Sequence, residues 1–251
     1  MRWETHPTEP KMKISEIYEK LNTLSPFELQ EKWDNSGLLV GDMSREFEHI
    51  ALGLDLDRES LEEAEENTLF IVHHPLIFSG LKELDFSVYP ANLLEIMVKK
   101  NLSLIAMHTN FDKTHLNAYV FEKVLGFKKE FQDEFICRTT GSWSKDELLK
   151  LLKEKLNLET LRVVSPKQKI GSIALTTGAG ASLMDEVDAE CFLTGDIKYH
   201  NAMKAMSQNL MLVDIGHYES EKFFVDVLKV ELENLGLLGI ITQSQNPFEI
   251  I

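Results

Sequence analysis

The stretch Leu69-Phe70-Ile71-Val72-His73-His74-Pro75 is a short apolar run that leads directly into two adjacent histidines. Such a run predicts a buried strand, and the proline biases the residue before it away from helical backbone and marks a turn. Ligands of parallel sheets bind at the carboxyl ends of the strands. We therefore expect both imidazoles to face that edge of a sheet.

Around this stretch, short apolar runs alternate with segments of helical spacing, which predicts an α/β protein with largely parallel or mixed sheets. Residues 1–11 are expected to form a loose extension. In the first half, strands are expected at 37–41, 49–56, 69–72 and 102–107. Helices are expected at 14–24, after Ser25-Pro26, and at 58–66, 90–100 and 115–125.

The pattern is interrupted between residues 127 and 143, so we predict two similar α/β halves, 12–126 and 127–251. The sequence Ser144-Lys145-Asp146-Glu147 has the form of a capping box and predicts a helix through Lys155. Further strands are expected at 134–138, 161–164, 170–176, 190–193 and 210–214. Helices are expected at 181–187, 199–206 and 218–235. The predicted site lies at the strand ends between the halves.

Composition excludes several classes of protein. The chain has 251 residues, 43% of them hydrophobic, which is ample for a core. Its formal charge of −15, with no long basic run, argues against nucleic-acid binding. No stretch approaches the ~18 apolar residues of a membrane span. With only Cys137 and Cys191, buried reduced thiols in a cytoplasmic protein are the simplest interpretation.

Two further strands end in similar chemistry. The 102–107 run leads into His108-Thr109-Asn110-Phe111-Asp112, and the 210–214 run leads into Gly216-His217-Tyr218-Glu219-Ser220-Glu221. A spacing of four places His217 and Glu221 on one helical face. Imidazoles and carboxylates without thiolates suit Zn²⁺, Mn²⁺, Fe²⁺, Co²⁺ or Ni²⁺. Five or six ligands exceed one four-coordinate ion, whereas two ions roughly 3.5 Å apart would use them all and activate a water.

Each of these residues also has an ordinary structural interpretation. A single histidine at a strand end is usually a hydrogen-bonded structural group, which applies to His108 and more strongly to His6, His49 and His115. His217 and Glu221 alone would be an ordinary pair on a helix. The adjacent pair after the buried strand is harder to explain in this way, because neighbouring imidazoles repel when protonated and need partners when neutral.

A set of segments in this order resembles the family of GTP cyclohydrolase 1 type 2 homologs, or Nif-three-like proteins, in its short bacterial form. The resemblance runs from about Ile14 to the C-terminus. Besides the segments that carry the histidines, it rests on Trp33-Asp34-Asn35-Ser36-Gly37-Leu38, Gly178-Ala179-Gly180 and Thr194-Gly195-Asp196.

The resemblance implies a dinuclear metal site whose ligands are His73, His74, Asp112, His217 and Glu221. It also implies that Glu221 bridges the ions, that His108 lies nearby, and that the chain forms a ring-shaped homohexamer. The implied activity is hydrolysis of GTP at C8 of the purine with loss of formate. Glutamate is more usual in the family at the position of Asp196, which leaves a proton-transfer role there open.

Other residues rank lower. The turn at 178–180 precedes a predicted helix whose amides could hold a phosphate, although it equally fits a tight turn. Asp196 and His200 are four apart and could form a general acid/base pair or serve as surface residues. Asp34 and Asn35 either line a cavity or form a turn.

The sequence supports two functional hypotheses. The first is a dinuclear metal-dependent hydrolase acting on a small, anionic, nucleotide-like substrate, with Asp196, His200 and His108 as further catalytic candidates. The alternative is a non-catalytic metal-binding oligomeric scaffold or metal chaperone that acts through a protein partner. It is favoured by the lack of a recognisable substrate-binding motif.

Overall fold

The computed structural model describes residues 12–242 and 245–249, and the predicted extension at 1–11 lies outside them. The chain forms two compact units. Unit 1 comprises residues up to Phe111 together with those from Phe224 onward, and unit 2 is Asp112–Phe223. The predicted division at 126/127 therefore differs from the observed one. The reason is that the C-terminal segment packs into the core of unit 1 instead of extending the second half.

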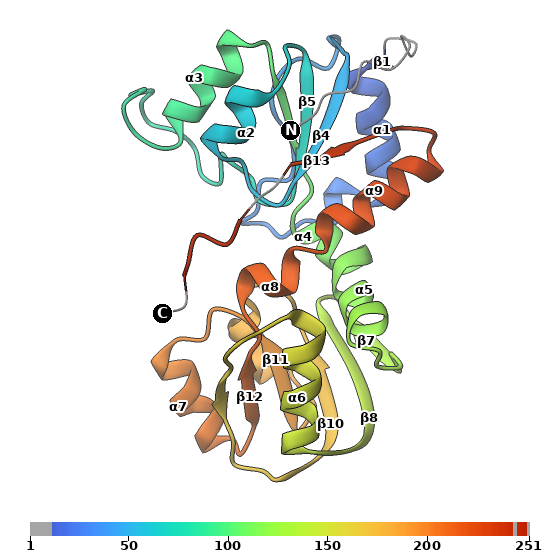
Figure 1. Cartoon of the computed structure of the whole chain (residues 1–251), viewed down its shortest axis with the longest axis vertical. Helices are drawn as coiled ribbons and strands as arrows, with labels where there is room; N and C mark the ends of the chain where they lie inside the picture. Colours follow the sequence, from blue (N-terminus) through green and yellow to red (C-terminus); the bar gives the residue numbers. More distant parts are fainter. Residues whose placement is uncertain (1–11, 243–244, 250–251) are drawn as a thin grey trace. The chain divides into compact units, whose positions relative to one another are not determined.

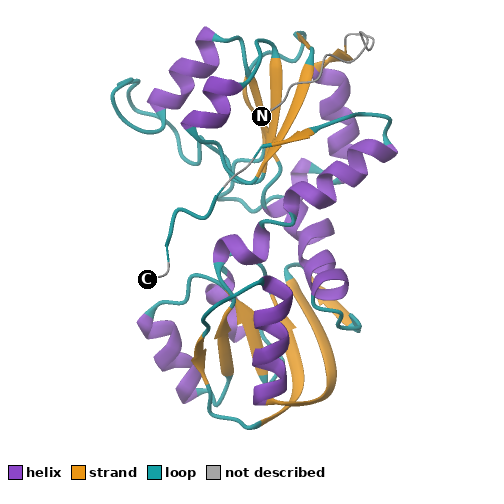
Figure 2. Cartoon of the chain, in the orientation of Figure 1, coloured by secondary structure: helices purple, strands orange, loops and turns teal. Residues whose placement is uncertain are grey.

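Unit 1 is built on a five-stranded sheet with the order β13-β4-β5-β6-β2 (Figures 1 and 2). The first four strands are parallel, and β2 pairs antiparallel with β6 at the edge. The bounds are β2 Gly37–Val40, β4 His49–Gly53, β5 Thr68–Val72, β6 Ser103–Ala106 and β13 Ile240–Ile241. A two-stranded ribbon joins β1 Met12–Lys13 to β3 Glu46–Phe47.

Helices cover both faces of this sheet, as Figure 2 shows, which explains why every residue of β5 is buried. One face packs against α2 (Arg58–Glu63) and α3 (Ala91–Lys99), with Phe70, Leu61 and Met97 in one apolar cluster. On the other side lie α1 (Ile14–Leu24) and α9 (Phe224–Asn234), the latter in contact with β4. The prediction of a helix after Ser25-Pro26 corresponds to a single 3₁₀ turn, Phe27–Leu29.

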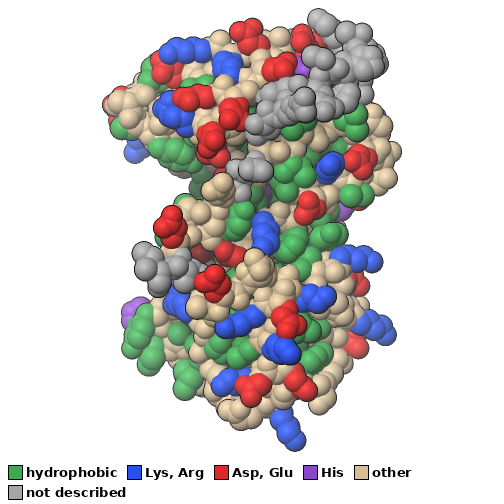
Figure 3. Space-filling model, in the orientation of Figure 1, with side chains coloured by type: hydrophobic (Ala, Val, Ile, Leu, Met, Phe, Trp, Pro, Cys, Tyr) green, Lys and Arg blue, Asp and Glu red, His purple; other side chains and the backbone are tan. Residues whose placement is uncertain are grey.

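Unit 2 contains a mixed six-stranded sheet with the order β7-β8-β10-β11-β12-β9, in which only β10, β11 and β12 are mutually parallel. The strand bounds are β7 Phe131–Asp133, β8 Ile136–Ser144, β9 Arg162–Val164, β10 Lys169–Leu175, β11 Cys191–Thr194 and β12 Met211–Asp214. The predicted mixed α/β class is confirmed. On the face drawn in Figure 3, basic and acidic side chains of this unit are interspersed.

Two helices and a 3₁₀ segment complete the cover of this sheet. The helix α6 (Lys145–Leu156) begins at the predicted capping box, where Ser144 accepts from the Glu147 amide and the Glu147 carboxylate accepts from the Ser144 amide. α7 is Tyr199–Ser207. The helix predicted at 181–187 is a 3₁₀ segment, Gly180–Asp185. Cys137 and Cys191 are free and buried, as expected.

Two helical predictions need correction. The helix expected at 115–125 begins earlier, as a run of α4 (Thr109–Phe111), a π-helical stretch (Asp112–Leu116), α5 (Asn117–Tyr119) and a second π-helical stretch (Val120–Val124). The single helix expected at 218–235 is two helices, α8 (His217–Glu221) and α9. It divides because Ser220 and Glu221 are buried in unit 2, whereas Phe224 and Leu228 are buried in unit 1.

No helix among the described residues is both long enough and apolar enough to cross a membrane.

The capping box makes a quantitative prediction about unit 2. Replacing Ser144 by alanine removes the side-chain acceptor for an amide of the first turn of α6, so we expect the free energy of unfolding to fall by about 1 kcal/mol. Urea unfolding followed by circular dichroism measures the loss. Ser144→Asp restores an acceptor oxygen and should recover most of it. Equal losses in the two variants would show that the cap does not stabilise the helix.

Candidate metal centre

In unit 1, His73, His74 and His108 lie together at the carboxyl ends of β5 and β6. One ring nitrogen from each can be chosen so that the three nitrogens lie within 4.8 Å of one another. The ring centroid of His73 lies 5.0 Å from that of His74 and 5.1 Å from that of His108. The predicted convergence of the two strand ends within this unit is therefore present.

The three rings share one hydrogen-bonding pattern. Nδ1 of His73 faces the Met107 carbonyl oxygen at 2.9 Å, Nδ1 of His74 faces Oδ1 of Asp55 at 2.7 Å, and Nδ1 of His108 faces Oδ1 of Asp34 at 2.7 Å. A carbonyl or carboxylate oxygen can only accept, so Nδ1 carries the proton in each ring. With Nδ1 as the donor, the neutral form of each ring presents Nε2 as its electron-pair donor.

This pattern is the one found around metal-bound histidines, which donate their second ring N–H to a carboxylate or a backbone carbonyl. The partner fixes both the tautomer and the orientation of the ring. His73 is fully buried, and its ring packs against Phe224 at a centroid distance of 4.9 Å. Three imidazole donors held in this way fit a divalent transition ion.

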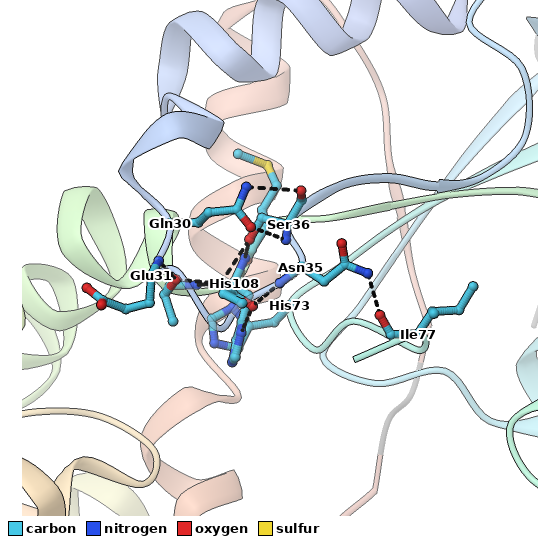
Figure 4. A network of polar contacts seen from close by, with 10 residues as sticks. Gln30, Glu31, Asn35, Ser36, His73, Ile77 and His108 are labelled. Atoms are coloured by element: carbon cyan, nitrogen blue, oxygen red, sulfur yellow. Dashed lines mark hydrogen bonds and ion pairs between the residues drawn. The ribbon is translucent and has the colours of Figure 1, made fainter. Parts of the chain in front are cut away.

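The position of His108, which is labelled in Figure 4, depends on Asp34. The Asp34 side chain is fully buried and also accepts hydrogen bonds from the Thr109 amide and hydroxyl, the Asn35 amide and the Ser36 hydroxyl. Burial by itself raises the pKa of this carboxyl. The bond and charge of His108, with the Thr109 and Asn35 bonds, outweigh burial and hold the pKa below its ordinary value.

Sequence reasoning missed the role of two carboxylates in this cluster. Asp34 was expected only to line a cavity or form a turn, and Asp55 was not singled out. Both lie far from their histidine partners in the chain, and the residue type alone carries no sign of such a pairing. A tertiary contact is what makes them orienting groups.

In unit 2, α8 places His217 and Glu221 one helical turn apart, as predicted. Nε2 of His217 and Oε2 of Glu221 are 2.9 Å apart, and Glu221 is 3% exposed. Bonds from a metal to imidazole nitrogen or carboxylate oxygen are about 2.0–2.2 Å, so both atoms could reach one ion. Nδ1 of His217 faces Oδ2 of Asp196 at 2.8 Å, which repeats the pattern of unit 1.

Glycines at two turns allow α8 to pack closely within unit 2. A Cβ atom at Gly178 would lie 1.9 Å from Oε1 of Glu221, and one at Gly195 would lie 2.7 Å from the His217 amide nitrogen. The turn at Gly178 also has a φ of +62°, which favours glycine. These glycines therefore belong to the support of Glu221 and His217.

The hydrogen bonds of the 178–180 turn argue against the phosphate interpretation and favour the tight turn. Its Gly178 amide donates to Oγ of Ser220, and its Gly180 amide donates to Oγ1 of Thr194, both at 2.9 Å. The preceding Thr177 amide donates to Oδ1 of Asn117 at 2.7 Å. These three amides already donate to acceptors inside unit 2, so they are not available to an anion.

The predicted pairing of Asp196 with His200 is also absent. Asp196 bonds to His217 instead, and its φ of +53° belongs to the turn that ends β11. Within the part of the chain that the structure describes, His200 makes no hydrogen bond or ion pair; its exposed ring contacts Tyr199 on α7. The structure thus makes Asp196 an orienting group for His217.

Two further carboxylates, Asp112 and Asp214, lie near or at the ends of β6 and β12. Asp112 is 7% exposed and lies in the π-helical stretch of unit 2. Asp214, which ends β12, was not singled out from the sequence. Burial raises the pKa of its carboxyl, although the Gly216 amide, the charge of Arg162 and the Ile197 amide partly offset this effect.

The buried Asp34 carboxylate predicts a dependence on pH. Asp34→Asn should lower the free energy of unfolding of the metal-free protein by about 1.5–3 kcal/mol at pH 7, because charge-assisted hydrogen bonds are lost. A carboxylate with a lowered folded-state pKa stabilises the fold above the ordinary pKa of about 3.9. This contribution declines as the pH falls below that value.

Urea unfolding at pH 7 and between pH 3 and 4 measures this dependence. The difference between wild type and Asp34→Asn should shrink at the lower pH. An Asp226→Asn variant, altered at an exposed carboxylate on α9 of the same unit, serves as the control. A difference that stays constant with pH would contradict the assignment.

The close packing at Gly178 is tested against a second glycine of the same unit. Gly178→Ala combines a positive φ with a clash against Glu221, whereas Gly126→Ala has a φ of +78° and nothing within 4 Å. Overpacking costs typically about 1–3 kcal/mol, so Gly178→Ala should lose that much more stability than Gly126→Ala in urea unfolding. Equal losses would show that Glu221 moves aside freely.

Comparisons with known proteins agree with this architecture. Residues 12–247 match the model of the family described as Duf34/NIF3 (NGG1p interacting factor 3). A Campylobacter jejuni protein named GTP cyclohydrolase 1 type 2 homolog is 50% identical over 95% of this chain and 99% of its own. A Helicobacter pylori protein named GTP cyclohydrolase 1 type 2 is 42% identical over 95% of this chain and 99% of its own.

Solved structures show the same fold. A Staphylococcus aureus hypothetical protein matches with a TM-score of 0.83 at 27% identity, covering 96% of this chain and 100% of its own. Reduced HcgD from Methanocaldococcus jannaschii matches with a TM-score of 0.78 at 26% identity, covering 92% and 98%. From the family match and the 50% identity over nearly its full length, the chain belongs to the Duf34/NIF3 family.

Proposed function

We propose that this protein is a dinuclear metal-dependent hydrolase that acts on a small, anionic, nucleotide-like substrate. The observation that carries the proposal is the shared orientation of the histidines. Nδ1 of His73, His74 and His108 faces an oxygen acceptor in unit 1, and Nδ1 of His217 does so in unit 2. Metal-bound histidines almost always donate their second ring N–H to a carboxylate or a backbone carbonyl, and all four of these rings face such an oxygen.

The proposed ligands are His73 and His74 of unit 1 and Asp112, His217 and Glu221 of unit 2, with His108 as an additional ligand or a neighbouring group. All offer nitrogen or oxygen, which suits Zn²⁺, Mn²⁺, Fe²⁺, Co²⁺ or Ni²⁺. Such ions lower the pKa of a bound water toward neutrality and polarise a substrate oxygen. The chain's own residues orient the donors: Asp34, Asp55 and Asp196 each hold one ring.

The names of the C. jejuni and H. pylori relatives support a nucleotide substrate. At 50% and 42% identity over nearly the whole chain, they make a purine nucleotide such as GTP the first compound to test. The proposed positive charge of two ions against two carboxylate ligands favours an anionic substrate despite the formal charge of −15.

The metal content of purified protein is the first test. We expect about two divalent ions per chain in the wild type, and a loss of at least one in His73→Ala and in Glu221→Gln, which keeps the shape of the side chain. His49→Gln is the matched control, because His49 begins β4 and forms an ion pair with Glu65 instead of facing the proposed ligands. Mass spectrometry of the metals and circular dichroism of each variant give the result. Undiminished metal in folded His73→Ala and Glu221→Gln variants would overturn the site.

Turnover is tested separately with the metal-loaded protein. Incubation with GTP should release formate, and the release should disappear on chelation and in Asp112→Asn. If GTP is inert, a panel of phosphomonoesters, phosphodiesters and cyclic amides identifies another substrate of the same chemistry. Bound metal without turnover on any of these compounds would favour the metal-binding scaffold.

A further inference from the structure

Two exposed aromatic side chains lie beside the histidine cluster of unit 1. Trp33 is 58% exposed and Phe78 is 50% exposed. Their ring centroids are 5.8 Å apart and lie 6.2 and 6.3 Å from that of His108. Neither ring is needed to fill the core, so their position requires another explanation.

The segments that carry the two rings are joined by partly buried polar contacts. Trp33 directly precedes Asp34, whose buried carboxylate bonds to His108 and Thr109. Nδ2 of Asn35 donates to the Ile77 carbonyl at 2.6 Å and so ties the segment of Trp33 to that of Phe78, as Figure 4 shows. The contacts that orient His108 therefore also place the aromatic pair before any ligand arrives.

The geometry makes the pair a platform and not a clamp. Aromatic atoms pack at about 3.5–4.0 Å, so a planar ring held between two others needs about 7 Å between them. At 5.8 Å, with an angle of 42° between their planes, Trp33 and Phe78 already pack against each other. A planar ligand can stack only on an outward face, and the large exposed fraction of Trp33 leaves such a face open.

We propose that Trp33 and Phe78 form a stacking platform for the base of a nucleotide substrate. This inference rests on the proposed function for the nucleotide class and adds the residues that recognise its base. Any base has a π face that stacks on an aromatic side chain, so the platform recognises planarity rather than a hydrogen-bonding pattern. The contact of both rings with His108 would bring the stacked base to the proposed metal ligands.

The test uses tryptophan fluorescence, which does not depend on turnover. The chain has three tryptophans, and replacing Trp3 and Trp143 by phenylalanine leaves Trp33 as the only one. Guanosine monophosphate should quench Trp33 saturably, whereas ribose 5-phosphate, which lacks the base, should not. Phe78→Ala removes the ring that supports Trp33 and should weaken the binding, by up to the roughly 150-fold that stacking on one aromatic side chain supplies. Phe78→Tyr should retain it.

Phe86→Ala is the matched control, because Phe86 is 49% exposed in the same segment and has no ring contact with Trp33 or Phe78. The titrations are run with zinc and with chelator, and metal content is measured in parallel. Quenching without bound metal would support the platform while removing the hydrolase site. Metal binding without quenching would overturn the platform alone.

A second copy of the chain is the other possible occupant of these rings. In that case the emission of Trp33 would shift with protein concentration in the absence of nucleotide, in step with the mass measured by sedimentation. Guanosine monophosphate would then fail to quench, and the platform would be rejected.

Discussion

The buried carboxylate of Asp34 is the constraint on which the histidine cluster of unit 1 depends. A carboxylate removed from water must be satisfied by hydrogen bonds, and Asp34 meets this requirement with bonds to His108, Thr109, Asn35 and Ser36. Each bond positions a neighbour of the cluster. The same contacts give His108 its tautomer, attach the start of α4 to the turn before β2, and hold Trp33 at the surface.

Unit 2 also contains a buried carboxylate, Glu221, and close packing holds it in place. Its α8 carries His217 and the nearly buried Glu221, and such a carboxylate is tolerated only with partners at short range. The turns at Gly178 and Gly195 lie so close to α8 that a Cβ atom at either position would clash with Glu221 or His217. The turn at 178–180, which resembles a phosphate-binding turn in the sequence, thus packs against Glu221.

In both units, each candidate ligand histidine has an oxygen atom that faces its Nδ1 and orients the ring. The acceptors are a backbone carbonyl for His73 and carboxylates for His74, His108 and His217. The pattern distinguishes these rings from His200, which is exposed and, among the described residues, makes only a ring contact with Tyr199. It is a chemical signature that depends on hydrogen bonds and therefore does not rest on fold similarity.

By itself, the sequence determined the α/β class, most strand positions, the capping box at Ser144 and the convergence of His73, His74 and His108, because these follow from local periodicity and from where buried strands end. Only the tertiary structure decided the partners Asp34, Asp55 and Asp196, the division of the last helix, and the return of α9 and β13 to unit 1. These features arise between residues far apart in the chain. Burial and hydrogen bonding select such partners, and neither leaves a periodic trace in the sequence.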